Sequence, residues 1–457
     1  MKKIFFGISS MPWLYATLKN KNNNMKRSLK GIAENFLPAQ ELNPEQKERL
    51  ERMAVVAKNI IGSFGFDPKK ETMTVITDTG VMESQPELIA AIQGELEAMT
   101  AGHKARGNFR IRVLTESERS AEDMGDYVEA EMESQRQAPI LIITSMSRSH
   151  SKETGAAIRS IADREKLDAT LSAARSKSQL AGLEDKLSDE QWEKLEQFAR
   201  QNACRIISIT KGKNPHEILT EGAVEESAEA ILERDDKVNE LMKNVERVHL
   251  TSLAGTDLWL PIIKETKGYE SEDFTKPGSM GNYPIGEWAC SPNWEGSSGS
   301  LVINGPIGGE HMLDAVNEHG PVRLTIANGE VTEINNRPIS DDTGNPLVES
   351  VKAYLNAGNN GHNDAYRLAE LGIGTNTMAC RGKEAKDVGS SEGEKMYGTV
   401  HIAVGSNGSM GVPKSHPSFN RAKVHCDMIL MGEVNVECEK DDGSRFFLIK
   451  DGKPQGY

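Results

Sequence analysis

The sequence is poor in cysteine and has no long hydrophobic run. Its five cysteines are scattered over 457 residues and form no Cys-x-x-Cys pair. They therefore indicate neither a disulfide framework nor a thiolate zinc site, and they favour a reducing compartment. No segment is apolar over the roughly 20 residues that a membrane-spanning helix needs. We expect a cytoplasmic protein that does not enter a membrane.

The first residues do not overturn this expectation. "MKKIFFGISSMPWLYATLKN" has two lysines and a short apolar run, as a secretory signal does. However, Pro12 interrupts the run and no clean cleavage site of small residues follows it.

Positive charge is also in deficit. The formal net charge is −14 at pH 7, whereas proteins that bind nucleic acids present basic surfaces to the phosphates. The same deficit disfavours an anionic membrane surface. We therefore expect neither nucleic acid nor membrane as a partner.

The first half of the chain alternates strand-like and helical patterns. Short β-branched runs occur at 72–78, 109–115, 138–147 and 204–210, and amphipathic segments occur at 43–65, 85–99 and 120–135. Strands that alternate with helices pair in parallel, because each parallel neighbour needs a crossover. The highly charged segment 162–201 reads as a helical insertion between the third and fourth strands.

From about residue 246 the pattern changes to strands separated by glycine turns. Strand-like runs lie at 247–262, 299–308, 321–334, 397–405 and 423–432, and a helix is predicted over 364–374. We therefore predict an α/β protein in two domains. Residues 1–245 form an open parallel α/β sheet domain, in which 1–37 are expected to be poorly ordered and 162–201 are a helical insertion. Residues 246–457 form a mainly β (α+β) metal-binding domain.

Several polar residues stand inside the apolar runs of the second half. The strand period of two places His425 and Asp427 on one face of "KVHCDMIL", and His401 lies in another strand. Three glutamates occur in similar surroundings: Glu287, Glu370 and Glu394. Lysine and arginine are sparse in these stretches, so buried carboxylates would need a metal cation. Imidazole and carboxylate suit zinc, cobalt, manganese or iron(II), and two ions explain so many ligands better than one.

The less specific interpretation is that each residue is only hydrogen-bonded or exposed. It holds for any one of them alone, and the joint pattern within one domain argues against it. A purely structural zinc site in a binding protein is disfavoured as well, because such sites are often rich in thiolates.

Five stretches then resemble, in order, the leucyl aminopeptidase family of aminopeptidase T and aminopeptidase S. They are "SLAGTDLWLPI", "NYPIGEWACSPNWEGSSGSLVING", "AELGIGTN", "EKMYGTVHIAVGSN" and "HCDMIL". The resemblance implies a two-domain, dimeric metallo-aminopeptidase that acts on peptides through two zinc, cobalt or manganese ions. The implied metal ligands are Glu287, Glu370, His401, His425 and Asp427. Glu394 or Glu287 would be the catalytic carboxylate that moves the proton.

The sequence departs from the peptidase pattern at two positions. Gly408 stands where the family has a tyrosine, and Gly393 stands where it has an aspartate. Ring-opening dihydroxypyridine dioxygenases resemble the same superfamily and would use His401, His425 and Asp427 as ligands of one iron(II). A hydrolase needs Glu287 and Glu370 and a triad enzyme does not, so we expect an aminopeptidase first and a dioxygenase as the alternative.

Overall fold

The computed structural model describes part of the chain, in two compact units. The described residues are 44–78, 81, 85–100, 109–114, 139–144, 205–210, 221–268, 273–276, 279–309, 311–359, 364–408, 410–413, 415–420 and 422–457. One unit is Met1–Ile61 with Phe66–Lys213, and the other is Gly62–Gly65 with Asn214–Tyr457. The predicted domain limit after residue 245 stays a prediction. The stretch 1–37, expected to be poorly ordered, and the predicted insertion 162–201 lie outside the described residues.

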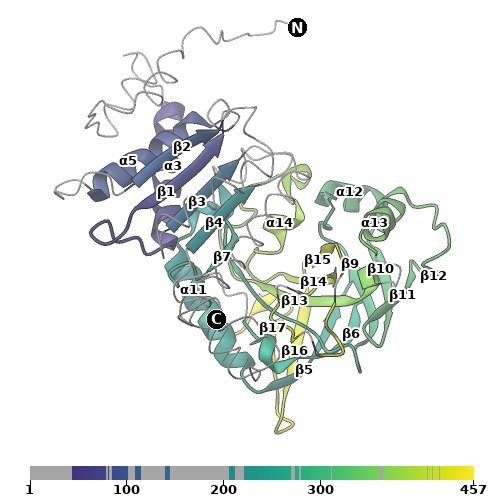
Figure 1. Ribbon diagram of the computed structural model, residues 1–457. Coiled ribbons are helices and arrows are strands. Elements are labelled where there is room, and N and C mark those ends of the chain that lie inside the picture. Colours follow the sequence, from purple (N-terminus) through teal and green to yellow (C-terminus); the bar gives the residue numbers. More distant parts are fainter. Residues whose placement is uncertain are drawn as a thin grey trace, which may run out of the picture. The chain divides into compact units, whose positions relative to one another are not determined.

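The first unit contains a parallel sheet with the strand order β2-β1-β3-β4 (Figure 1). Its strands are β1 (Met73–Asp78), β2 (Phe109–Leu114), β3 (Pro139–Thr144) and β4 (Arg205–Thr210), and its described helices are α3 (Pro44–Ser63) and α5 (Pro86–Thr100). Val75, Leu141 and Ile207 are buried in neighbouring strands. Nearly continuous apolar strands are typical of parallel sheets covered on both faces. The predicted α/β fold class is confirmed.

The second unit is dominated by a nine-stranded sheet with the order β12-β11-β10-β9-β6-β5-β16-β17-β18. These strands are β5 (Val245–Ser252), β6 (Asp257–Pro261), β9 (Ser298–Ile303), β10 (Val322–Ala327), β11 (Glu330–Ile334), β12 (Arg337–Pro338), β16 (Val434–Lys440), β17 (Arg445–Lys450) and β18 (Lys453–Pro454). The β10–β11 hairpin turns through Asn328 and Gly329, both at positive φ. Such a turn matches the twist of the flanking strands, as the Asn-Gly pair in the sequence indicates.

A second, four-stranded antiparallel sheet in the same unit has the order β15-β14-β13-β8. Its strands are β8 (Glu287–Cys290), β13 (Leu368–Gly374), β14 (Val400–Gly405) and β15 (His425–Leu430). Side chains from both sheets, such as Leu258 and Leu301 from the large one and Trp288 and Leu371 from the small one, belong to one buried apolar cluster. One face of the small sheet is therefore part of the core, which leaves the other face for function.

Short helices and one short strand complete the second unit. They are α11 (Ala228–Met242), α12 (Leu313–His319), α13 (Pro346–Ala357), α14 (Ser390–Gly393), the 3-10 turns η3 (Gly222–Glu225), η4 (Lys264–Thr266), η5 (Asp364–Tyr366) and η6 (Ala385–Asp387), and the strand β7 (Met280–Asn282). α13 begins at a typical cap, because the Asn345 side chain accepts hydrogen bonds from the amides of Leu347 and Val348. None of the helices among the described residues has the length and hydropathy required to cross a membrane.

The predicted helix over 364–374 is wrong. The chain makes a single 3-10 turn there, η5, and then enters β13. The apolar spacing of Leu368, Leu371 and Ile373 fits a helix only loosely, whereas Glu370, Gly372 and Gly374 alternate with apolar residues as in a strand. Two glycines also disfavour a helix, since each costs about 1 kcal/mol relative to alanine there.

Candidate metal centre

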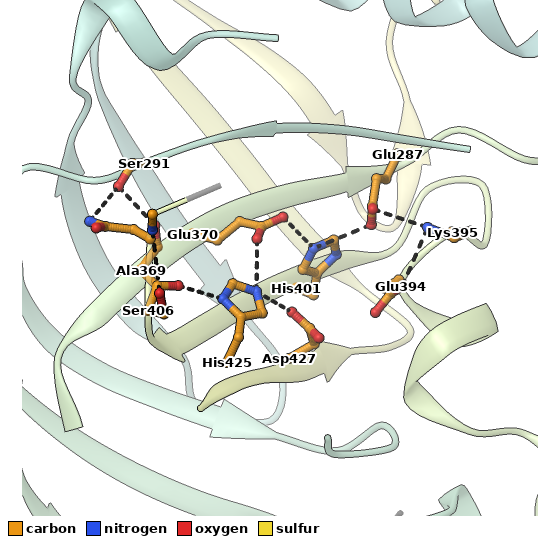
Figure 2. Close-up of polar contacts among 12 residues, drawn as sticks. Glu287, Ser291, Ala369, Glu370, Glu394, Lys395, His401, Ser406, His425 and Asp427 are labelled. Atoms are coloured by element: carbon orange, nitrogen blue, oxygen red, sulfur yellow. Dashed lines mark hydrogen bonds and ion pairs between the residues drawn. The ribbon is translucent and has the colours of Figure 1, made fainter. Parts of the chain in front are cut away.

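The small sheet carries a row of polar side chains on the face that turns away from the core (Figure 2). The antiparallel register explains why they share this face. Gly374 pairs with Glu287, Gly372 with His401, and Ala403 with both Glu370 and Asp427. Residues two apart in a strand point to the same side. The side chains of Glu287, Glu370, His401, His425 and Asp427 therefore converge, as the sequence predicted for His425 and Asp427.

Small residues make room for this row. An added Cβ at Gly372 would lie 2.0 Å from Cε1 of His401, so the imidazole occupies the space above the glycine. Gly405 pairs with His425 and has a φ of +108°, and its Cβ would lie 2.2 Å from the carbonyl oxygen of Val424. Only glycine adopts such a backbone without strain. The glycines of "ELGIG" and "HIAVG" are therefore part of the site.

The geometry around His425 points to a cation. Nδ1 of His425 lies 2.7 Å from the carbonyl oxygen of Ser406, which can only accept, so Nδ1 carries a proton. Nε2 lies 3.0 Å from Glu370 Oε2 and 3.0 Å from Asp427 Oδ1. In a neutral ring Nε2 carries a lone pair, which would face two carboxylate oxygens. A proton or a metal ion is needed among the three atoms, and a carbonyl bound at the other nitrogen is the usual support of a metal-bound histidine.

A second set of donors lies beside the first and shares Glu370. His401 Nε2 is 3.1 Å from Glu370 Oε1 and 3.7 Å from Glu287 Oε2. Within the described residues, two groups of three could hold a metal ion: Glu287, Glu370 and His401, and Glu370, His425 and Asp427. In each group the ligand atoms lie within 4.8 Å of one another. The predicted combination of His401 with His425 and Asp427 is not one of these groups.

The two groups differ in access. Glu370 and His401 are buried, whereas the side chains of His425 and Asp427 are 30% and 21% exposed. The group of His425 therefore has an open side, as a catalytic metal position requires. The imidazole and carboxylate donors fit a divalent transition metal.

The four central groups stabilise each other as ions in the absence of metal. Burial alone would lower the pKa of His425, but Asp427 and Glu370 raise it well above its ordinary value. Burial likewise opposes the charge of His401, yet its hydrogen bond with Glu370 raises its pKa to about 9. Burial would raise the pKa of Glu370 and Asp427, but the histidines lower both. A metal ion would take the place of these protons.

Sequence reasoning missed a buried lysine at the edge of the centre. Lys395 is 2% exposed, and its Nζ lies 3.0 Å from Glu287 Oε1 and 3.4 Å from Glu394 Oε1. Glu394 belongs to neither group of metal donors. Burial raises its pKa to about 7, against the attraction of Lys395. A Glu-Lys pair just before a histidine strand was the available signal.

Two other side chains, Tyr397 and His416, have polar groups that could replace the family tyrosine, but both have other contacts. The Tyr397 hydroxyl donates to the carbonyl oxygen of Tyr457, at 2.6 Å, and His416 Nδ1 accepts from the amide of Ser418. An added Cβ at Gly393 would lie 2.9 Å from Pro306 Cγ, so the aspartate of the peptidase pattern has no room there. These residues therefore compensate neither of the two departures from the peptidase pattern.

Comparison with known proteins identifies the family. Residues 102–439, well over half of the 457 residues, match the family described as 2,5-dihydroxypyridine 5,6-dioxygenase, NicX. The chain belongs to the NicX family. No curated protein sequence matches it.

Two solved structures share the fold. The 2,5-dihydroxypyridine dioxygenase of Pseudomonas putida KT2440 is 14% identical with a TM-score of 0.53, over 91% of this chain and 99% of that one. AmpT from Thermus thermophilus is 14% identical with a TM-score of 0.51, over 89% of this chain and 99% of that one. The predicted resemblance to aminopeptidase T is thus confirmed at the level of the fold.

The predicted aminopeptidase activity is corrected here, because the family match favours the dioxygenase alternative. The prediction rested on Glu287 and Glu370 as evidence of two metal ions. The structure weakens that inference, since Lys395 already provides a cation for Glu287. What stands is an enzyme of a metal-dependent family, with imidazole and carboxylate donors in one place.

Proposed function

We propose that this NicX-family protein is a metal-dependent dioxygenase that opens the ring of a dihydroxylated pyridine. The observation that carries the proposal is the family match over residues 102–439. The open donor group of Glu370, His425 and Asp427 supports it, because oxygen and an aromatic diol both need free positions beside the metal.

In this proposal, different residues of the centre bind the metal and accept the proton. Glu370, His425 and Asp427 hold the metal, and the Ser406 carbonyl keeps Nε2 of His425 directed at it. The bound metal would be iron(II), which supplies the redox chemistry that oxygen activation requires. Glu394, with a pKa near 7, is suited to accept the proton of a ring hydroxyl at neutral pH.

The test is oxygen uptake with 2,5-dihydroxypyridine. Purified protein is stripped with a chelator, loaded anaerobically with iron(II) and mixed with the substrate in the presence of labelled O₂. We expect loss of the ring absorbance, consumption of one O₂ for each ring and both labelled oxygen atoms in the opened product. Turnover without incorporation of label would refute the proposal.

Two variants set the controls. His425→Ala removes a donor of the open group and should abolish both metal binding and oxygen uptake. His416→Ala changes a histidine whose Nδ1 only accepts from a backbone amide, so it should retain both. If His425→Ala kept its metal and its activity, the assignment of the open group would be wrong.

A further inference from the structure

The carboxylates of the centre meet a fixed positive charge that belongs to the chain. Glu287 uses one oxygen, Oε1, to contact Lys395 and the other, Oε2, to face His401 (Figure 2). Oε1 of Glu394 lies 3.4 Å from the same ammonium group. With a side chain only 2% exposed, Lys395 lies between these two carboxylates and away from bulk water. A buried ammonium group needs such partners, because burial without them is very costly.

The backbone around Lys395 is tied down from two directions. Its amide donates to Glu392 O at 3.1 Å, and its carbonyl accepts from the amide of Asn376 at 2.9 Å. The Asn376 side chain in turn donates to two further carbonyl groups, at 2.9 and 3.0 Å. Glu392 is itself buried in an ion pair with Lys383 and accepts from the amide of Cys380. These hydrogen bonds fix the backbone of Lys395 and so restrict where its ammonium group can lie.

The ammonium group of Lys395 lies beside the buried donor group of Glu287, Glu370 and His401. A divalent ion held by Glu287, Glu370 and His401 would share Glu287 with Lys395, and two cations on one carboxylate repel each other. Glu287 does not belong to the group of Glu370, His425 and Asp427, so its ion pair with Lys395 leaves that group available. We propose that Lys395 takes the role of a second metal ion, so that the centre binds one divalent cation, at Glu370, His425 and Asp427.

This inference rests on the metal centre of the proposed function, but not on its reaction. It assigns Lys395 and Glu287 to charge balance and assigns metal binding to the open group. A ring-opening dioxygenase of the proposed kind needs one redox metal, so the two proposals agree. A hydrolytic centre of two metals would have to bind its second ion against the charge of Lys395.

The experiment counts metal ions. Full-length wild-type protein and Lys395→Met are stripped, saturated with zinc, desalted and analysed for zinc per chain. Lys352→Met is the matched control, because Lys352 is also buried and paired with a glutamate, Glu349, but belongs to neither donor group. We expect about one zinc for wild type and for Lys352→Met, and about two for Lys395→Met. Two zinc ions in wild type would overturn the proposal, as would one in a folded Lys395→Met.

A second variant keeps the test decisive if Lys395→Met does not fold. Glu287→Gln preserves the shape of the side chain and removes its charge. We expect it to keep about one zinc with an affinity within about threefold of wild type, because the role of Glu287 is to pair with Lys395 and not to bind the metal. Loss of the zinc would contradict the proposal. Zinc counting requires no turnover, so an inactive protein with one metal refutes the proposed function and leaves this inference intact.

Discussion

Gly372→Ala is the most direct test of how the sheet builds the centre. The new Cβ would lie 2.0 Å from Cε1 and 2.1 Å from Nε2 of His401. Carbon atoms in contact lie about 3.5–4.0 Å apart, so the imidazole must retreat by about 1.5 Å. His401 holds Glu370 at 3.1 Å, and Glu370 in turn faces His425. We therefore expect the displacement of His401 to shift Glu370 and to weaken metal binding, although Gly372 is not itself a metal donor.

Two magnitudes follow from this displacement. Overpacking a buried site costs about 1–3 kcal/mol, which corresponds to a fall of roughly 2–12 °C in Tm for a unit of this size. Loss of the support around a metal ligand commonly weakens metal affinity by about 10–100-fold. Zinc competition with a chelator and thermal unfolding in excess chelator measure the two effects separately.

The control is Gly62→Ala in α3, where an added Cβ meets nothing within 4 Å. It should leave zinc affinity unchanged and stability equal or up to about 1 kcal/mol higher, since alanine favours a helix. If Gly372→Ala kept wild-type Tm and affinity, His401 would not support Glu370 in the way described.

Two further predictions concern buried charges in the same unit. Asp235 is only 3% exposed, and burial raises its pKa from 3.8 to about 7. Because the folded state favours the protonated form of Asp235, its contribution to stability is complete below about pH 4 and is lost as the pH rises through 7. Wild type should therefore lose roughly 1–3 kcal/mol more unfolding free energy between pH 5 and pH 8 than Asp235→Asn, as measured by urea titration; an equal loss in both proteins would contradict this. Lys383→Met leaves Glu392 buried without its cation and should lower the unfolding free energy by about 3–5 kcal/mol. Lys386→Met, with a lysine that is 62% exposed, should change it by less than about 1 kcal/mol in the same urea titration.

Local patterns sufficed to predict much of the fold. The runs at 72–78, 109–115, 138–147 and 204–210 became β1 to β4 because each is short, β-branched and bounded by polar segments. The strand period also placed His425 and Asp427 on one face correctly. β13 was misread because both of its faces are buried, so the alternation of Glu370, Gly372 and Gly374 with apolar residues does not mark an exposed face.

The partners in the centre depend on contacts that no local pattern reveals. Lys395 and Glu287 are 108 residues apart in the sequence and meet only because β8 and β14 flank β13. The sequence correctly showed that lysine and arginine are sparse around the carboxylates, but one lysine in the right position changes the charge balance. The inference of two metals came from counting carboxylates without that lysine.

The chemistry of this centre cannot be decided by its fold. AmpT and the P. putida dioxygenase share the fold with this chain at the same 14% identity, and one fold can host different reactions. The difference must therefore come from the charges around the ligand face. Four carboxylates, Glu287, Glu370, Glu394 and Asp427, gather near two histidines and one buried ammonium group. If Lys395 keeps its charge, one divalent ion leaves a centre close to neutral once Glu394 holds a proton, whereas a second ion would make it positive beside a buried lysine. The number of metal ions is thus the property on which the reaction class depends most directly.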